Sequence, residues 1–536
     1  MRFDDWFLAA EERGNPATDI DRRHADGLAW TEGNRVDVLV DGATYFARLY
    51  DELSTLRADD WVHFTDWEGD PDERLVGPGT AIGHVLADLA RDDVYVRGLL
   101  WRSHPRQAHF SEQQNTKLVR EINKAGGEVL LDERVRRGGS HHQKLVYIRR
   151  APDHGGPDDD VAFVGGVDLC HGRHDDSDHD GDAQAVDLDP RYGKHPPWHD
   201  LQLEIHGPAI GDLAHTFRER WEDPTPFDHR NPVRVAARKL TRQPRHPDPL
   251  PPPRDDPAPA GPHAVQVMRT YPAKKPPYPF APDGERSIGR AYRKAIARAR
   301  KLIYVEDQYL WSSGWAGAIA DALRTQLDLR LIAVVPRFAE RGGRSAHAEN
   351  IGRQRVIDEL RAAGGDRVAI YDLENQHGTP IYVHAKICVI DDVWLEVGSD
   401  NLNRRSWTHD SELSCAVLDT TFDEREPRDP GGLGDRARVL ARDTRLRLWR
   451  EHLGRADGDD DDLVDFDSGF VAWQTTAHAL DQWHRDGGNG ARPPGHARPH
   501  RPERVPTAQH LVARAAHRLF VDPDGRPRDL RGTDDL

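Results

Sequence analysis

A short pattern occurs twice in this chain: a histidine and a lysine two residues apart within an apolar, β-rich run. His384 and Lys386 lie in IYVHAKICVI, and His142 and Lys144 lie in HHQKLVYI. Side chains two residues apart point to the same face of a strand, so each copy presents an imidazole and an ammonium group together. One such pair is a weak signal. Two copies in matching surroundings predict a duplicated fold that builds one site.

Each copy is followed by a second apolar run and a glycine turn. The turns hold small and polar residues: Gly398, Ser399 and Asn401 in the second copy, and Gly165, Gly166 and Asp168 in the first. A hairpin would return each turn to the side of its histidine and lysine. Imidazoles, fixed cations and neutral hydrogen-bond donors, without clustered carboxylates, suit a phosphodiester. We expect Asp168 to accept hydrogen bonds from Lys144 or a backbone amide, because it would repel a phosphate.

The surroundings of both motifs predict an α/β fold. Apolar strand patterns alternate with amphipathic helix patterns from residue 35 onward, and the same alternation begins again after residue 263. Such alternation is typical of α/β layers, and a repeat of about 200 residues indicates a duplicated domain rather than a solenoid. We therefore predict two similar α/β/α lobes packed around one shared active site.

The predicted domain boundaries follow from composition. They are a first lobe at 1–240, a proline-rich extended linker at 241–263, a second lobe at 264–455 and a polar C-terminal extension at 456–536. The linker cannot form the interior of a helix or sheet because of its prolines. Two helical patches in the extension, at 470–484 and 508–520, are expected to dock on the body of the protein.

Composition limits the partners. The 536 residues carry 74 Lys and Arg against 91 Asp and Glu, a formal charge of −17, which disfavours nucleic-acid scaffolds and general binders of anionic membranes. Three cysteines cannot all pair, and neither a signal peptide nor an apolar run of membrane-spanning length is evident. We expect a cytoplasmic monomer with transient membrane-surface contact, no nucleic-acid partner and no cofactor.

The paired motifs resemble those of the phospholipase D superfamily, H-x-K-x4-D followed by G-G/S-x-N or its Asp variant. The second copy fits throughout, with Asp391 at the motif aspartate, whereas the first copy has Arg149 there and a longer, polar hairpin. The run GGVDLCHGRHDD is similar to a run in eukaryotic-type members. The resemblance covers roughly residues 35–455. It implies a structural role for the aspartate, so the loss at Arg149 is expected to be compensated.

The resemblance also implies roles for individual residues. His142 would be the nucleophile and His384 the general acid, with Lys144, Lys386, Asn401 and Ser399 stabilising the phosphoryl oxygens. Asp200 and Glu412 would orient the two histidines, although Asp200 fits a strand-capping aspartate equally well. Glu306 and Gln308 lie in IYVEDQYLW, similar to a rim segment of the family, where contact with substrate and a structural role are both open. Gly166 would lie against the substrate as well.

The stretch 171–195 is rich in His and Asp but has no regular ligand spacing. We therefore interpret it as a solvated loop rather than a metal site. No metal is expected in the reaction, because the paired histidines and lysines can do what a divalent ion does in other phosphodiesterases.

The function expected from the motifs is that of a phospholipase D-type phosphodiesterase. It would hydrolyse glycerophospholipids, or transfer their phosphatidyl group, through a covalent phosphohistidine. The alternatives are a phosphatidyltransferase of the cardiolipin synthase kind, a nuclease, and, from another class, a catalytically inactive module that binds lipid or a partner. Release of a phospholipid headgroup, measured beside DNA and RNA controls, separates them.

Overall fold

The computed structural model describes residues 2–102, 112–154, 159–226, 246–311, 313–531, 533 and 535–536, with 232, 235 and 236 as isolated positions. Part of the first hairpin (155–158) and the start of the predicted linker (241–245) lie outside these residues. Within them, 246–262 contain neither helix nor strand, as their prolines predict.

The first lobe is a seven-stranded segment of sheet with the order β1-β8-β6-β5-β2-β3-β4. Its strands are β1 (Thr31–Val40), β2 (Trp61–Asp66), β3 (Tyr95–Trp101), β4 (Glu128–Asp132), β5 (Leu145–Arg149), β6 (Val161–Gly165) and β8 (Leu201–His206). Its helices are α2 (Gly42–Leu53), α3 (Ile82–Arg91), α4 (Glu112–Lys124) and α5 (Ala209–Trp221). The expected alternation of strands and helices is confirmed here.

The second lobe repeats this order as β9-β17-β16-β15-β11-β12-β13. Its strands are β9 (His263–Tyr271), β11 (Leu302–Asp307), β12 (Arg330–Val334), β13 (Val368–Leu373), β15 (Lys386–Ile390), β16 (Trp394–Gly398) and β17 (Glu412–Asp419). Its helices are α7 (Ser287–Arg298), α8 (Ser313–Thr325), α9 (Arg344–Gly364), α10 (Arg404–Thr408) and α11 (Val439–Leu453). The strand order confirms the predicted duplication.

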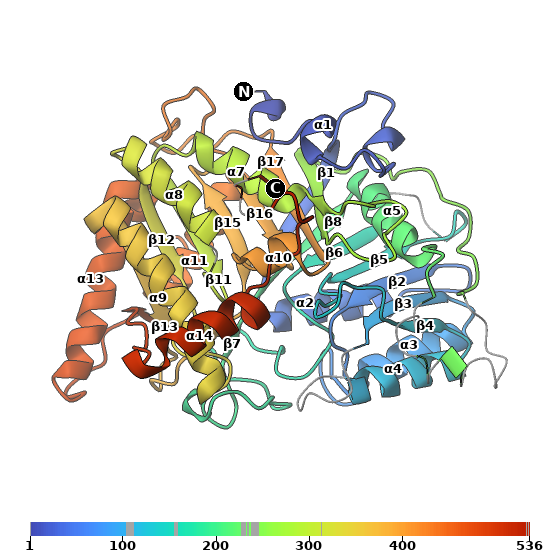
Figure 1. Cartoon of the computed structure of the whole chain (residues 1–536), viewed down its shortest axis with the longest axis horizontal. Helices are drawn as coiled ribbons and strands as arrows, with labels where there is room; N and C mark the ends of the chain where they lie inside the picture. The colour runs from blue at the N-terminus through green and yellow to red at the C-terminus, as the bar shows by residue number, and fades with distance from the viewer. Residues whose placement is uncertain are drawn as a thin grey trace.

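The two lobes join edge to edge. Strand β1 pairs antiparallel with β9, and this contact fuses the halves into one 16-stranded sheet, with the second lobe on the left and the first on the right in Figure 1. A buried apolar cluster crosses the seam and includes Leu203 and Ile205 from one side and Val265, Ile387 and Val389 from the other. Burial of this shared surface stabilises the two lobes as one unit.

A second connection crosses between the lobes away from the main sheet. The short strands β7 (Trp198–His199) and β14 (Tyr382–Val383) pair in parallel. Each immediately precedes a predicted site residue, Asp200 in the first half and His384 in the second. This two-stranded contact therefore fixes the backbone of both halves where the motifs approach each other.

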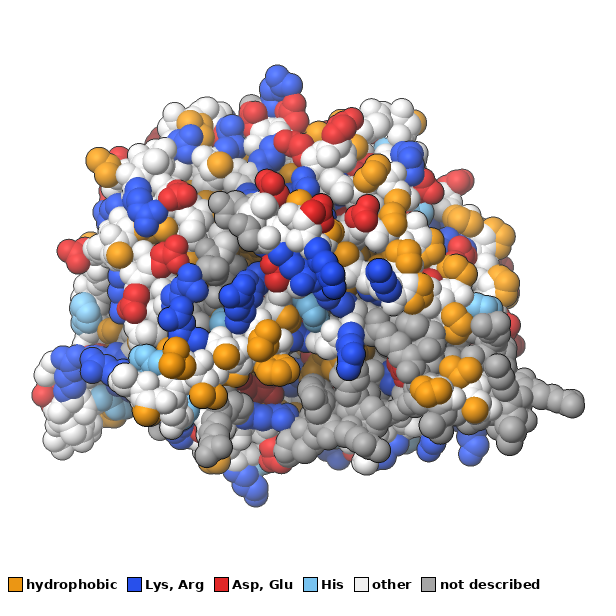
Figure 2. Space-filling model, in the orientation of Figure 1, with side chains coloured by type: hydrophobic (Ala, Val, Ile, Leu, Met, Phe, Trp, Pro, Cys, Tyr) orange, Lys and Arg blue, Asp and Glu red, His pale blue; other side chains and the backbone are white. Residues whose placement is uncertain are grey.

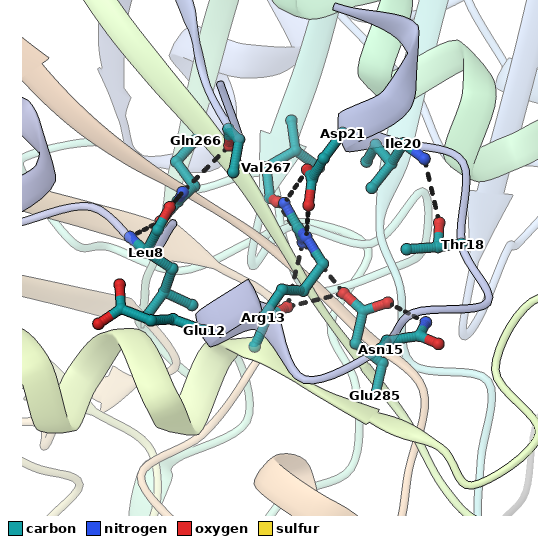
Figure 3. A network of polar contacts seen from close by, with 12 residues as sticks. Leu8, Glu12, Arg13, Asn15, Thr18, Ile20, Asp21, Gln266, Val267 and Glu285 are labelled. Carbon is teal, nitrogen blue, oxygen red and sulfur yellow. Dashed lines mark hydrogen bonds and ion pairs between the residues drawn. The ribbon is translucent and has the colours of Figure 1, made fainter. Parts of the chain in front are cut away.

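The N-terminal segment packs on the second lobe. Trp6, Phe7 and Trp30 belong to the buried cluster under α7 and α8, although the predicted boundary places them in the first lobe. Figure 3 shows the polar part of this contact, where the buried Arg13 donates to Asp21, to Glu285 of β10 (Glu285–Arg286) and to the carbonyl of Val267. The segment contains the 3-10 helix η1 (Phe3–Asp5) and the short helix α1 (Ala10–Arg13). The boundaries themselves remain a prediction.

The C-terminal extension is part of the body. Its elements are α12 (Asp461–Val464), α13 (Phe466–Arg485), β18 (Ala497–Pro499) and α14 (His510–Ala516). Strand β18 pairs antiparallel with β13 at the edge of the sheet, and α13 buries Trp473 against the core. Among the described residues, no helix is long and apolar enough to cross a membrane. The three cysteines are buried and free.

The hairpin of the second motif depends on Asp391. Its carboxylate accepts hydrogen bonds from the backbone amides of Arg300, Lys301 and Leu302, at 2.7–2.8 Å, and so ties the hairpin turn to the start of β11. Arg149 occupies the equivalent position in the first motif and makes different contacts. Its guanidinium donates to Asp160 across the β5–β6 hairpin at 2.7 Å and to the carbonyl of Asp255. The partners of both residues lie outside the site.

We expect Arg149→Asp to destabilise the protein while leaving turnover within about tenfold, because no contact in the site changes. The substitution breaks a buried ion pair and places two carboxylates together, which costs about 3–5 kcal/mol in the free energy of unfolding. Denaturant unfolding and turnover of the same preparation check this. Arg57→Asp, on an exposed loop, is the control and should change stability little. A large gain in turnover for Arg149→Asp would contradict a structural role.

Candidate active site

The two motif histidines are held by backbone bonds from the opposite lobe. The amide of His142 donates to the carbonyl of Ser411, at the start of β17, at 2.9 Å. The amide of His384 donates to the carbonyl of His199, in β7, at 2.8 Å. Neither motif is therefore positioned by its own half alone.

The side chains repeat this exchange. Nδ1 of His142 lies 2.8 Å from the Glu412 carboxylate, and Nδ1 of His384 lies 2.6 Å from the Asp200 carboxylate. Asp200 and Glu412 are both fully buried. A carboxylate that accepts the Nδ1 proton fixes the tautomer and leaves Nε2 for chemistry. Both predicted carboxylates thus lie on histidines, each on the histidine of the other lobe.

The two lysines occupy matching places. Nζ of Lys144 donates to the carbonyl of His142 at 3.2 Å and pairs with Asp168 at 3.3 Å. Nζ of Lys386 donates to the carbonyl of His384 and lies 3.5 Å from the amide oxygen of Gln308. The ion pair expected between Lys144 and Asp168 is present. Both ammonium groups are buried, so each is a charge that water shields poorly.

The glycines of the two turns are closely packed against neighbouring groups. A Cβ at Gly166 would lie 2.1 Å from the Asp200 carboxylate, and a Cβ at Gly398 would lie 1.9 Å from the Ser414 hydroxyl. Gly165 is equally close to the carbonyl of Leu201. The glycines are therefore required for the close approach of strands and of Asp200, and Gly166 lies against the carboxylate that contacts His384.

The polar residues of the second turn differ in their partners. The hydroxyl of Ser399 donates to Glu412 at 2.6 Å, so it supports the carboxylate that orients His142. Asn401 is buried, and its side-chain oxygen has no hydrogen-bond partner among the described residues. Direct contact of Ser399, Asn401 or Gln308 with substrate remains a prediction.

Three site residues were not singled out from the sequence. Arg173 follows the first glycine turn; its guanidinium lies 3.4 Å from Asp168 and 4.0 Å above the ring of Trp198. Trp198 in turn lies against His384, with ring centroids 4.9 Å apart, and Trp67 lies edge-on to His142 at 6.3 Å. Arg173 lies within GGVDLCHGRHDD, and Trp198 directly precedes the His199–Asp200 pair, so proximity in sequence was the available signal.

Burial and charge set the protonation of the second histidine pair. Burial, with Lys386, Arg173 and Lys144 nearby, holds the pKa of His384 well below its usual value. Burial also raises the pKa of Asp200 to about 6 and lowers the pKa of Lys386 to about 8. At neutral pH the free protein therefore presents a neutral His384 imidazole beside an ionised Asp200 and a charged Lys386.

The Asp168 carboxylate belongs to a similar balance. Burial opposes its charge, but Lys144 and Arg173 outweigh burial and lower its pKa. Its neighbour Asp66, at the end of β2, has a pKa raised well above the usual range by burial and by Asp168. The pair thus carries one negative charge at neutral pH. That charge is paired with Lys144 and Arg173, so it is not free to repel a phosphate.

Glu306 does not contact the motif histidines. It accepts hydrogen bonds from Nε2 of His199 at 2.7 Å and from Nε2 of His452 at 2.9 Å, which is the structural role left open above. Nδ1 of His199 lies 3.0 Å from the Asp41 carboxylate and 3.5 Å from the Glu451 carboxylate. His199 directly precedes Asp200 in the chain, so this buried cluster lies next to the carboxylate that contacts His384.

Donor atoms of Asp41, His179, His199 and Glu451 all lie within 4.8 Å of one another, so these residues could hold a metal ion. Two imidazoles and two carboxylates are donors that divalent cations accept, and Glu306 would orient His199 from behind. His179 is buried, so the interpretation of the whole 171–195 stretch as a solvated loop is wrong there. The other donors come from distant segments, which is why spacing within the loop gave no signal.

The comparisons with known proteins agree with the duplication. Residues 70–245 match the family described as phospholipase D, and residues 292–425 match the family described as cardiolipin synthase, PLD-like domain. Together these matches span more than half of the chain. Each contains one histidine–lysine motif.

Curated relatives match at low identity. "Phospholipase D alpha 1" of Arabidopsis thaliana is 27% identical over 62% of this chain and 51% of its own length, and "Phospholipase D alpha 2" of Oryza sativa subsp. japonica is 26% identical over 62% and 51%. The chain thus spans about half the length of these relatives. Among solved structures, phosphatidylserine synthase of Haemophilus influenzae aligns with a TM-score of 0.47 and 11% identity, over 72% of this chain and 82% of that one.

We expect Asp200→Asn to lower kcat by roughly 10²–10⁴-fold with a small change in KM, because the amide cannot stabilise the charged imidazole of His384. Steady-state kinetics on the purified variant measure this. Glu396→Gln is the matched control, since burial holds the pKa of Glu396 well above its usual value and the amide replaces a neutral acid. Equal losses in both variants would show that Asp200 acts only on folding.

The lowered pKa of Lys386 predicts an alkaline limit. Its charge is present below about pH 8 and is lost as the pH rises through that value, so kcat/KM should fall with a midpoint near pH 8. The limit on kcat should lie higher, because a bound phosphate favours the charged ammonium. Lys386→Arg keeps its charge, so its residual activity should show no limit in this range. A wild-type profile flat to pH 10 would contradict this assignment.

Proposed function

The chain belongs to the phospholipase D superfamily, and from this premise we propose that it is a phosphodiesterase that hydrolyses glycerophospholipids or transfers their phosphatidyl group to an alcohol. The observation that carries the proposal is the reciprocal arrangement of two histidines, each hydrogen-bonded to a buried carboxylate of the other lobe. Two oriented imidazoles beside fixed cations are what a two-step displacement at phosphorus requires.

The first step forms a covalent phosphohistidine. Nε2 of His142 attacks the phosphorus, and the leaving alcohol takes a proton from Nε2 of His384. The neutral His384 of the free protein acquires that proton on binding of the anionic substrate, whose charge offsets Lys386, Lys144 and Arg173. These three cations stabilise the non-bridging oxygens, and the Asn401 amide adds a donor.

The second step breaks the intermediate. His384, now neutral, takes a proton from water or from an acceptor alcohol, whose oxygen attacks the phosphorus of the His142 adduct. Release of phosphatidic acid or a new phosphodiester returns both histidines to their starting states. Two successive displacements predict retention of configuration at phosphorus.

Phospholipid rather than nucleic acid is the substrate class supported by charge. The formal charge of −17 disfavours the long phosphate contacts that nucleic acids offer. The description of the family matched by residues 292–425 favours phosphatidyl transfer as the second outcome, with an alcohol in place of water.

The experiment is headgroup release from mixed phospholipid micelles, with and without a primary alcohol, beside DNA and RNA. We expect free headgroup and, with alcohol, a transphosphatidylation product, whereas the nucleic acids stay intact. Lys144→Met with Lys386→Met is the matched inactive control. Cleavage of nucleic acid alone would make the protein a nuclease, and no turnover of any substrate would leave a binding module.

A histidine variant tests the covalent step. His384→Ala, given a phosphodiester with a good leaving group, should accumulate a phosphoryl adduct on His142, because formation needs little acid help and breakdown lacks its base. Peptide mass spectrometry at neutral or alkaline pH locates the adduct, since phosphohistidine is acid-labile. An adduct on His384 in His142→Ala would reverse the two roles. Inversion at phosphorus, with no adduct in either variant, would refute the two-step mechanism.

A further inference from the structure

The last helical segment turns its apolar side chains to solvent. It comprises α14 (His510–Ala516) and the π-helical turn η7 (His517–Val521) and is called the terminal helix below. Leu511, Val512, Leu519 and Phe520 are 82%, 73%, 65% and 74% exposed. Four of the ten large apolar side chains that the described residues expose thus lie within one decapeptide. An apolar helix face normally packs on the core, so this one is unpartnered.

The opposite side of the terminal helix fastens it to the second lobe. Ala513 is buried, Nδ1 of His517 lies 2.8 Å from the carbonyl of Ala348, and Arg405 donates to the carbonyl of Phe520 at 3.0 Å. The expected docking of 508–520 on the body is therefore found, but through its small and polar side chains. The apolar face is held outward.

Cations surround this face. Arg514 and Arg518 are exposed on the terminal helix itself. Beside it lies a cavity of about 590 Å³ that also meets Leu519 and whose lining is rich in arginine: Arg136, Arg137, Arg404, Arg518, Arg526 and Arg531. Asp524 lines it too, paired with Arg526 at 2.8 Å. Figure 2 shows the basic and apolar side chains side by side across the face where Figure 1 places α14.

This combination is unusual for a chain with a formal charge of −17. Apolar side chains beside arginines fit a partner that offers anionic groups and an apolar phase at one boundary. The surface of a phospholipid bilayer does so, and helices of this composition lie in such interfaces. Arginine in particular matches phosphate geometry.

The terminal helix is also coupled to the active site by packing. Gln308 lies beside Lys386, and three residues later in the chain Trp311 stacks on Tyr309, with ring centroids 3.9 Å apart. The rings of Trp311 and His517 are arranged edge to face, with centroids 5.9 Å apart. The terminal helix therefore packs, through His517, against the segment that carries Gln308.

We propose that the terminal helix and the arginine cavity form a docking site for an anionic phospholipid bilayer. Leu511, Val512, Leu519 and Phe520 enter the interface, and the cavity takes a lipid phosphate. Docking would bring the active site to its lipid substrate, and in this respect the proposal rests on the proposed function. Binding to the bilayer itself does not depend on turnover.

The experiment is vesicle flotation of the full chain, with vesicles of phosphatidylcholine alone and of phosphatidylcholine with equal phosphatidylglycerol. We expect wild type to float with the anionic vesicles and to be released by salt. The combined variant L511S/V512S/L519S/F520S should bind at least about tenfold more weakly. R137Q/R518Q/R531Q should lose the preference for phosphatidylglycerol. L327S/V471S, which changes two exposed apolar residues elsewhere on the surface, should bind like wild type.

Three results would overturn the proposal: wild type that floats with neither vesicle, the four-serine variant that floats like wild type, or a wild-type dimer that this variant converts to monomer. The last would mean that a second copy covers the face. Turnover of a short-chain phospholipid below its micellar concentration separates this proposal from the proposed function. The docking variants should retain that turnover, and its absence in wild type would refute the function while leaving flotation informative.

Discussion

The structure depends on two hydrogen bonds that cross between its lobes: His142 to Glu412 and His384 to Asp200. Each lobe supplies an imidazole to the site and a carboxylate to the imidazole of the other lobe. Such an exchange requires that both halves be fixed to within fractions of an ångström. The continuous sheet through β1 and β9, and the small β7–β14 pair beside the site, provide this rigidity.

The price of this arrangement is buried charge. Lys144, Lys386, Arg173, Asp168 and Asp200 are all largely removed from water, where an unpaired charge would be strongly unfavourable. The network offsets most of that cost through pairs such as Lys144–Asp168 and through a shared proton on Asp66. The part of the cost that is not offset shifts the pKa values of His384, Lys386 and Asp200. These are the groups that the proposed chemistry needs.

Much of this could be predicted from the sequence, for identifiable reasons. A two-residue spacing in a strand fixes the direction of His384 and Lys386, and a repeated pattern fixes the duplicated topology. Glu412 could be named because a charge inside an apolar strand needs a partner, whereas Asp200 is indicated by the family resemblance. The crossing of those partners could not be predicted, since it depends on how two edges of sheet meet.

Other features lay beyond any local pattern. The grouping of Asp41, His179, His199 and Glu451 joins the stretch 179–199 to residues more than 130 positions away on either side, so no local spacing reveals it. The outward apolar face of the terminal helix has the same periodicity as a buried one. Only the placement of Ala513 and His517 on the body distinguishes the two cases.

The proline-rich stretch between the lobes has a consequence for how the site responds to dilution. If the halves were separate chains, their meeting would be a bimolecular event, and the fraction of complete sites would fall as the protein became scarce. A covalent tether replaces that event with an intramolecular one, whose effective concentration does not depend on how much protein is present. The seam formed by β1 and β9 is therefore closed at any cellular abundance, and each molecule carries its own complete pair of histidines.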